Sequence, residues 1–136
     1  MHWVPLLLIL CAVGFDLRRR EIPDAIPLSL LAFTVGATAL GTTSHGWSSM
    51  LFGFGCAAAV GVVLFSVGAF GGGDVKLLAA LGAALGAREL VPLLFYVAIA
   101  GALLAGVAVA RGKRDLAYAP AIALGLLWLT FTRGFR

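Results

Sequence analysis

The stretch Phe70-Gly71-Gly72-Gly73-Asp74-Val75-Lys76-Leu77-Leu78 places three glycines, an acid and a lysine inside an otherwise apolar sequence. Consecutive glycines allow a sharp bend of the backbone and a close approach of another chain. A carboxylate near or within a membrane is costly, so Asp74 is by default a candidate functional residue. The alternative is a plain loop in which Asp74 is the N-cap of the next helix. The stretch therefore predicts a turn between two helices, with an acid that is either functional or a cap.

The composition of the chain indicates an integral membrane protein. Of its 136 residues, 62% are hydrophobic and 12% are charged, whereas about 25% of residues are charged in soluble domains. This excludes a soluble enzyme and a nucleic-acid-binding module. No polar linker is long enough to separate two domains, so we expect residues 1–136 to form a single membrane-embedded domain. The net charge of +4 comes from basic residues in short loops, which indicate topology and contacts with anionic lipid.

Six apolar segments predict an all-α, polytopic membrane protein with about six transmembrane helices. In chain order, the segments are Trp3–Phe15, Ala25–Leu40, Trp47–Ala69, Val75–Leu85, Leu90–Ala110 and Leu116–Thr132. The first and the fourth are short for a full crossing, which needs roughly 20 residues. A re-entrant fourth segment is therefore an alternative to a complete crossing. The first segment is interpreted as a retained helix because no basic residue precedes it and no small-residue cleavage site follows it.

Small residues recur at four-residue spacing in two of these segments. Gly53, Ala57 and Gly61 share one helix face, and Gly82 and Gly86 form a GxxxG pair. Such faces permit close packing of helices in a membrane. They would serve packing within the chain and association into a homo-oligomer equally well.

The sequence indicates no cofactor and no metal. Cys11 and Cys56 lie inside apolar runs without CxxC spacing, so we expect them to be small core residues. His2 and His45 are isolated and have no ligand-like partner at a useful spacing.

The basic residues predict which loops lie in the cytoplasm. The loops after the first, third and fifth segments hold Arg18, Arg19, Arg20, Lys76, Arg111, Lys113 and Arg114. The opposite side holds Arg88, Arg133 and Arg136. Because basic loops stay in the cytoplasm, the odd-numbered loops are expected there and both termini outside. Asp16 ends the first segment and Asp74 begins the fourth, so both acids are predicted at the cytoplasmic boundary.

Two carboxylates in a partly desolvated site have a defined chemistry. They resist joint ionisation, so they share a proton and titrate as a unit whose apparent pKa values are pushed apart. The ionised member can activate a water as general base, while the protonated member polarises a carbonyl. Two alternatives are a non-catalytic membrane scaffold and a small proton-coupled transporter, in which buried acids are also expected. The position of both acids at segment ends, away from the middle of the membrane, argues against transport.

These residues resemble the motifs of the type IV prepilin peptidases, which are polytopic aspartic proteases of the GxGD type. Asp16 is followed eight positions later by Asp24, which comes directly after Pro23. The run Gly71–Lys76 matches GxGD followed by a hydrophobic residue and a lysine. Residues Tyr118–Gly125 are similar to the last span of the family. The resemblance therefore covers most of the chain.

The resemblance implies an aspartic-type endopeptidase with Asp16 and Asp74 as the catalytic pair. It implies that Gly71 and Gly73 shape the turn that aims Asp74 at the scissile bond. Lys76 would favour ionised Asp74 or hold a nearby polar group, unless it is simply an interfacial lysine. The implied substrate is a prepilin or pseudopilin, such as an Flp pilin, with a short basic leader. Cleavage is implied just before the hydrophobic helix of the substrate, at the cytoplasmic face of the inner membrane.

The charged segment before the second helix has its own expected roles. Pro23 suits the start of that helix, and Asp24 is expected to cap it or to stabilise the loop. Arg18, Arg19 and Arg20 are topology anchors that would repel a basic leader. The candidates for receiving the leader are therefore Glu21, Asp24 and Asp115.

The sequence departs from the larger bacterial members of this family in one respect. Those members carry an N-terminal insertion with paired CxxC motifs that is linked to N-methylation of the mature pilin. The present sequence contains no CxxC. It looks like the short, peptidase-only form associated with Flp or tight-adherence pili, or like the archaeal preflagellin peptidases, so methyltransferase activity is expected to be absent.

Overall fold

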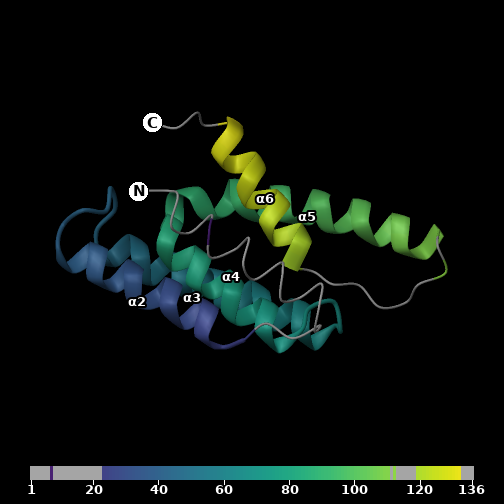
Figure 1. The fold of residues 1–136 in the computed structure, drawn as a ribbon, viewed down its shortest axis with the longest axis horizontal. Coiled ribbons are helices and arrows are strands. Elements are labelled where there is room, and N and C mark those ends of the chain that lie inside the picture. Colours follow the sequence, from purple (N-terminus) through teal and green to yellow (C-terminus); the bar gives the residue numbers. More distant parts are fainter. Residues whose placement is uncertain (1–6, 8–22, 111, 113–118, 133–136) are drawn as a thin grey trace.

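The computed structural model describes residue 7, residues 23–110, residue 112 and residues 119–132. These residues form helices and no strand (Figure 1). The helices are α2 (Ala25–Ala39), α3 (Trp47–Ser66), α4 (Gly72–Leu85), α5 (Ala87–Ala110) and α6 (Ala119–Thr132). The all-α prediction is confirmed. The count of about six membrane helices stays a prediction, because the first predicted segment lies outside the described residues except for Leu7.

Helix α3 ends at Ser66, three residues before the predicted boundary. Gly68 terminates the helix, and its φ of 76° is in the left-handed region. The N–H of Ala69 donates to the Leu64 carbonyl at 2.8 Å, and the N–H of Gly68 donates to the Phe65 carbonyl at 3.0 Å. These two bonds are those of a Schellman motif, which satisfies the last carbonyls of the helix.

Helices α4 and α5 both begin earlier than the sequence pattern predicted. Helix α4 starts at Gly72, where the prediction placed the start at Val75. Residues 87–89 were expected to be a loop, but they form the first turn of α5. Gly86 alone connects the two helices with φ 75° and ψ 171°, a conformation that is essentially restricted to glycine. The sequence pattern did not reveal this one-residue connection, because the two charged residues within 87–89 are typical of a loop.

Two of the described helices, Trp47–Ser66 and Ala87–Val107, are long and apolar enough to cross a membrane. A helix of 20 residues is about 30 Å long, which matches the hydrocarbon core of a bilayer. Residues Ala25–Ala39 and Pro120–Thr132 form shorter apolar helices. The membrane class predicted from composition agrees with these helices.

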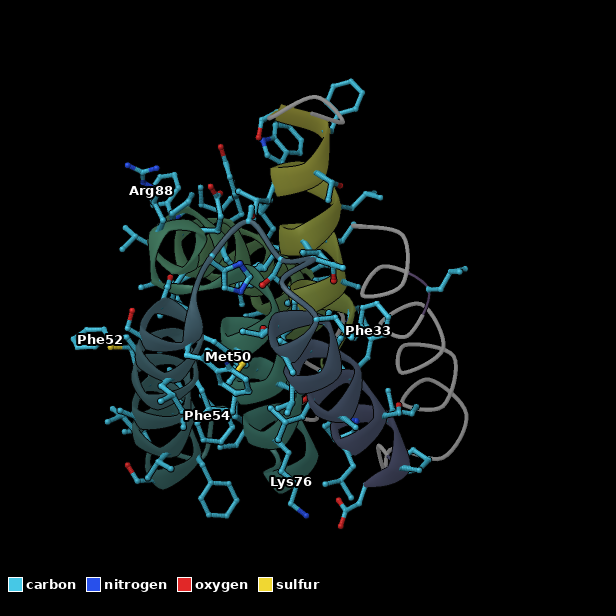
Figure 2. All side chains as sticks on the ribbon, turned by 90° about the vertical axis from the view of Figure 1, so that its left-hand side faces the viewer. Phe33, Met50, Phe52, Phe54, Lys76 and Arg88 are labelled. Atoms are coloured by element: carbon cyan, nitrogen blue, oxygen red, sulfur yellow. The ribbon has the colours of Figure 1, made fainter. Side chains whose placement is uncertain are left out.

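Helix α4 lies at the centre of the bundle. It packs against α2, α3 and α5, and Figure 2 shows it between α2 and α3, with α5 above them in this view. Leu77, Leu78 and Leu81 on α4 are completely buried. In a lipid environment such helices associate through close packing and hydrogen bonds, since the lipid tails are as apolar as leucine.

The packing of α3 on α4 uses the predicted face of small residues. Gly53, Ala57 and Gly61 are all buried on α3. A Cβ atom on Gly53 would overlap the carbonyl oxygen of Gly82, and one on Gly61 would lie 3.0 Å from Cγ1 of Val75. The prediction of close helix packing is confirmed. Because this face of α3 is covered by α4, it is not available for association with a second copy of the chain.

The outward surface of α3 is apolar. Leu51 and Phe52 are more than half exposed, and Figure 2 shows Phe52 pointing away from the bundle. Cys56 also lies on this surface, so the prediction that it is a core residue is wrong. The reason is that the inward face of α3 is narrow and occupied by Met50 and the small residues. Met50 points toward α2 (Figure 2), where its sulfur lies 3.6 Å from Oγ1 of Thr38.

Helix α6 crosses α5 (Figure 1) and packs on it closely. A Cβ atom on Gly125 would lie 2.6 Å from Cγ2 of Val97, so glycine permits the crossing. The rings of Tyr96 and Trp128 also meet here, with their centroids 6.3 Å apart. The crossing therefore joins the last described helix to the bundle.

Candidate active site

Asp74 lies in the first turn of the central helix. The N-cap of α4 is Gly71, and Asp74 occupies the third helical position. Its Oδ2 accepts a hydrogen bond from the Gly71 N–H at 3.1 Å, and only 8% of the residue is exposed. Asp74 is not the N-cap residue, but its side chain does cap the start of α4, as the alternative predicted, by accepting the N–H of the N-cap residue Gly71. An acid at the third helical position can accept a hydrogen bond from the N–H of the N-cap residue. Its negative charge is also favoured by the positive end of the helix dipole.

The three glycines before Asp74 do not make the bend expected of them. None of residues 71–73 has a positive φ, and the left-handed turn lies at Gly68. Gly71 and Gly72 are exposed. A Cβ atom on Gly72 would meet nothing within 4 Å, and one on Gly71 would meet only Asp74 Oδ2 at 3.4 Å. Because these two residues have no side chain, the backbone next to Asp74 is exposed here.

Lys76 and Asp24 join the first turns of two helices. The Nζ of Lys76 donates to Oδ1 of Asp24 at 2.7 Å, and both side chains are more than half exposed. Lys76 thus holds a nearby polar group, which was one of its predicted roles. Asp24 is the N-cap of α2, but its side chain makes no capping hydrogen bond. An exposed pair of this kind contributes about 0.2–1 kcal/mol to folding stability in water.

The described part of the first motif, Pro23 and Asp24, lies at the same end of the bundle as Lys76 of the second motif. Pro23 precedes α2, and its carbonyl accepts the Ile26 N–H at 3.0 Å, so it stands at the helix start as expected. Lys76 lies near the beginning of α4, whereas Arg88 follows its end, and Figure 2 shows the two far apart. Which side of the membrane each of the two residues occupies stays a prediction.

Several predicted site residues lie outside the described part of the chain. They are Asp16, Glu21 and Asp115. The pairing of Asp16 with Asp74 therefore stays a prediction. Of the three acids expected to receive a basic leader, the structure describes Asp24, whose carboxylate is held by Lys76.

A polar cluster that the sequence did not reveal closes the opposite end of α4. Nε2 of His45 lies 3.2 Å from the Ala83 carbonyl oxygen, and a carbonyl can only accept, so the ring nitrogen donates. Oγ of Ser49 accepts the Ala87 N–H at 3.1 Å. Each bond joins a side chain to backbone 38 positions away. No sequence signal marks such partners, because any residue provides the backbone groups.

The described residues contain no group of three or more His, Cys, Asp and Glu that could hold a metal ion. What they do contain at the Lys76 end is one buried carboxylate, an ion pair and an uncovered stretch of backbone. A carboxylate of this kind can accept or donate a proton during a reaction at a neighbouring carbonyl.

Comparisons with known proteins agree with the motifs. Residues 3–106 match the type IV leader peptidase family, a range that includes both motifs. The chain is 35% identical over 129 residues to the prepilin leader peptidase/N-methyltransferase of Bacillus subtilis (strain 168). That match covers 88% of this chain and 50% of the relative, so the chain spans about half the length of this relative. No solved structure matches the chain significantly.

Proposed function

Because this chain belongs to the type IV leader peptidase family, we propose that it is a membrane aspartic endopeptidase that removes the short basic leader of prepilin-like proteins. The observation that carries the proposal is the burial of Asp74 in the first turn of the central helix. A buried acid in an apolar bundle costs stability, so its presence there favours a chemical role. The position of Asp74 within the matched range supports the same role.

The proposed catalytic pair is Asp16 and Asp74, with one proton shared between them. The ionised carboxylate takes a proton from a water molecule, whose oxygen attacks the carbonyl carbon of the scissile peptide bond. The protonated carboxyl donates its proton to the carbonyl oxygen, which gives a neutral tetrahedral intermediate. Collapse of this intermediate breaks the carbon–nitrogen bond: the leaving amine takes the proton that came from water, and one hydroxyl of the intermediate gives its proton to the other carboxylate, which restores the singly protonated pair. One water is consumed and no cofactor is required.

The proposed substrate is a prepilin or pseudopilin, such as an Flp pilin, cut at the cytoplasmic face of the inner membrane. The distribution of basic residues supports this orientation, because it places the Lys76 end of the bundle in the cytoplasm. Gly71 and Gly72 are exposed and carry no side chain, which supports access of an extended substrate chain to the backbone next to Asp74. The apolar outward surface of α3 fits contact with lipid.

The proposal is tested by removing each acid while keeping its size. The chain is co-expressed with the prepilins of its own genome, and cleavage is followed in membranes at matched protein level. Asp16→Asn and Asp74→Asn are each expected to lower cleavage by at least about 100-fold, the usual minimum for loss of an acid–base group. Glu89→Gln is the matched control, since Glu89 lies in the first turn of α5 at the other end of α4.

Loss of cleavage in both Asn variants, with the control unchanged, supports the two-aspartate mechanism. Normal cleavage by either Asn variant contradicts it. In that case the non-catalytic scaffold becomes the better explanation of the family membership.

A further inference from the structure

We propose that the Asp24–Lys76 ion pair is a positioning device that holds the first turn of α4 in the orientation needed for catalysis by Asp74. This inference rests on the proposed peptidase function and adds two positioning residues to it. Neither residue is required to contact the substrate. The pair acts by fixing where the carboxylate of Asp74 points.

The geometry of the first turn of α4 carries this inference. Asp74 and Lys76 are two residues apart, so they project from nearly opposite sides of the helix. Asp74 is buried, whereas Lys76 is exposed and reaches across to α2. Any rotation of this turn about the helix axis that moves Lys76 also moves Asp74 by a comparable amount. Holding Lys76 therefore restricts the direction of the Asp74 carboxylate.

The turn is held from two sides by neighbours of Asp74. On the α3 side, Val75 packs against Gly61 so closely that a Cβ atom on Gly61 would lie 3.0 Å from Cγ1 of Val75. On the α2 side, Lys76 binds Asp24 at 2.7 Å. Close packing attracts the helices along their whole contact but gives the first turn of α4 little directional restraint. The ion pair adds a directional tie between the first turns of α2 and α4.

The local chemistry of Asp24 also favours this role. An aspartate at an N-cap ordinarily accepts a hydrogen bond from the first turn of its own helix. Asp24 occupies that position but makes no such bond, and its Oδ1 accepts from Lys76, 52 residues away. Asp24 also stands eight residues after Asp16. The pair therefore ties the start of α2, which follows Asp16 in the sequence, to the helix turn that contains Asp74.

An exposed ion pair contributes little to folding, so its loss should be seen mainly in turnover. A displacement of about 1 Å at a catalytic group can lower the rate by about 100-fold. We expect Asp24→Asn and Lys76→Gln each to lower kcat by about tenfold or more, with KM within about twofold of wild type, because a misplaced catalytic group lowers kcat without weakening substrate binding. The thermal unfolding midpoint should stay close to that of wild type.

The experiment uses the full chain in detergent and a synthetic prepilin that has a lysine-rich leader followed by an apolar helix. The key variant is the double substitution Asp24→Asn with Lys76→Gln. If the two residues act through one another, the double variant loses no more kcat than the more affected single variant. Asp24→Glu and Lys76→Arg keep the charges and should retain most of the turnover. Arg88→Gln, which removes a charge at the other end of α4, is the control.

Three results would overturn the positioning role: losses that multiply in the double variant, a raised KM with unchanged kcat, or single variants with normal kcat. Asp74→Asn is measured in parallel to separate this inference from the proposed function. If Asp74→Asn is inactive while the pair variants are normal, the positioning role alone is wrong. If Asp74→Asn cleaves the synthetic prepilin normally, the peptidase mechanism itself is wrong.

Discussion

The substitution Gly53→Ala tests whether the contact between α3 and α4 holds the bundle together. The added Cβ atom would overlap the carbonyl oxygen of Gly82 and lie 3.0 Å from the carbonyl carbons of both Gly82 and Gly86. The obstacle is helix backbone, which cannot rotate away as a side chain can. The two helices must therefore move apart or tilt at this point.

The size of the effect follows from these contacts. Restoring an ordinary separation between the Cβ atom and the Gly82 carbonyl requires α3 and α4 to move apart by about 1 Å. A gap of that size removes a quarter to a half of the dispersion energy of the contacts on either side. Overpacking of this kind costs about 1–3 kcal/mol. We therefore expect the free energy of unfolding to fall by that amount.

The matched control is Gly55→Ala, on the same helix two residues away. A Cβ atom on Gly55 would meet nothing within 4 Å, so alanine should be neutral or stabilise the helix by about 0.4–1 kcal/mol. Both variants and wild type are unfolded in mixed micelles by titration with a denaturing detergent. If Gly53→Ala is as stable as Gly55→Ala, the close packing of α3 on α4 described above is incorrect.

Two further predictions concern the opposite end of α4. Gly86→Ala should destabilise the protein by about 1–3 kcal/mol. The backbone angles φ 75° and ψ 171° suit only glycine, and the new Cβ atom would lie 2.8 Å from Oγ of Ser49. An unchanged midpoint in the same detergent titration would contradict this prediction. Ser49→Ala should cost about 1–3 kcal/mol, because the Ala87 N–H loses its acceptor. Its control is Ser48→Ala, whose side chain is exposed, and equal stability of the two serine variants would refute the role of that hydrogen bond.

Much of the fold was predictable because its signals are local. The apolar runs predicted the start and end of α2 within one residue, and the start of α3 correctly. The four-residue spacing of Gly53, Ala57 and Gly61 predicted a packed face, which the structure shows covered by α4. These predictions succeeded because residues at four-residue spacing lie on one side of an α-helix regardless of the rest of the sequence.

Other features depended on contacts that no local pattern records. Gly68 makes the turn that was expected of the triple glycine, because the last carbonyls of α3 are satisfied by hydrogen bonds just there. Cys56 faces outward although its sequence neighbourhood is apolar, since both the core and the lipid-facing surface of such a protein are apolar. Apolar composition therefore distinguishes inside from outside poorly in a membrane bundle.

The sequence by itself determined the membrane class, the helical segments and the motif acids that indicate a leader peptidase, because these depend on composition and on short spacings. Only the tertiary structure decided that α4 is the central helix and that Asp74 is buried in its first turn. It also decided that Lys76 pairs with Asp24 across 52 positions. The physical reason is that burial and pairing depend on which helices lie side by side, and that arrangement results from the packing of the bundle as a whole.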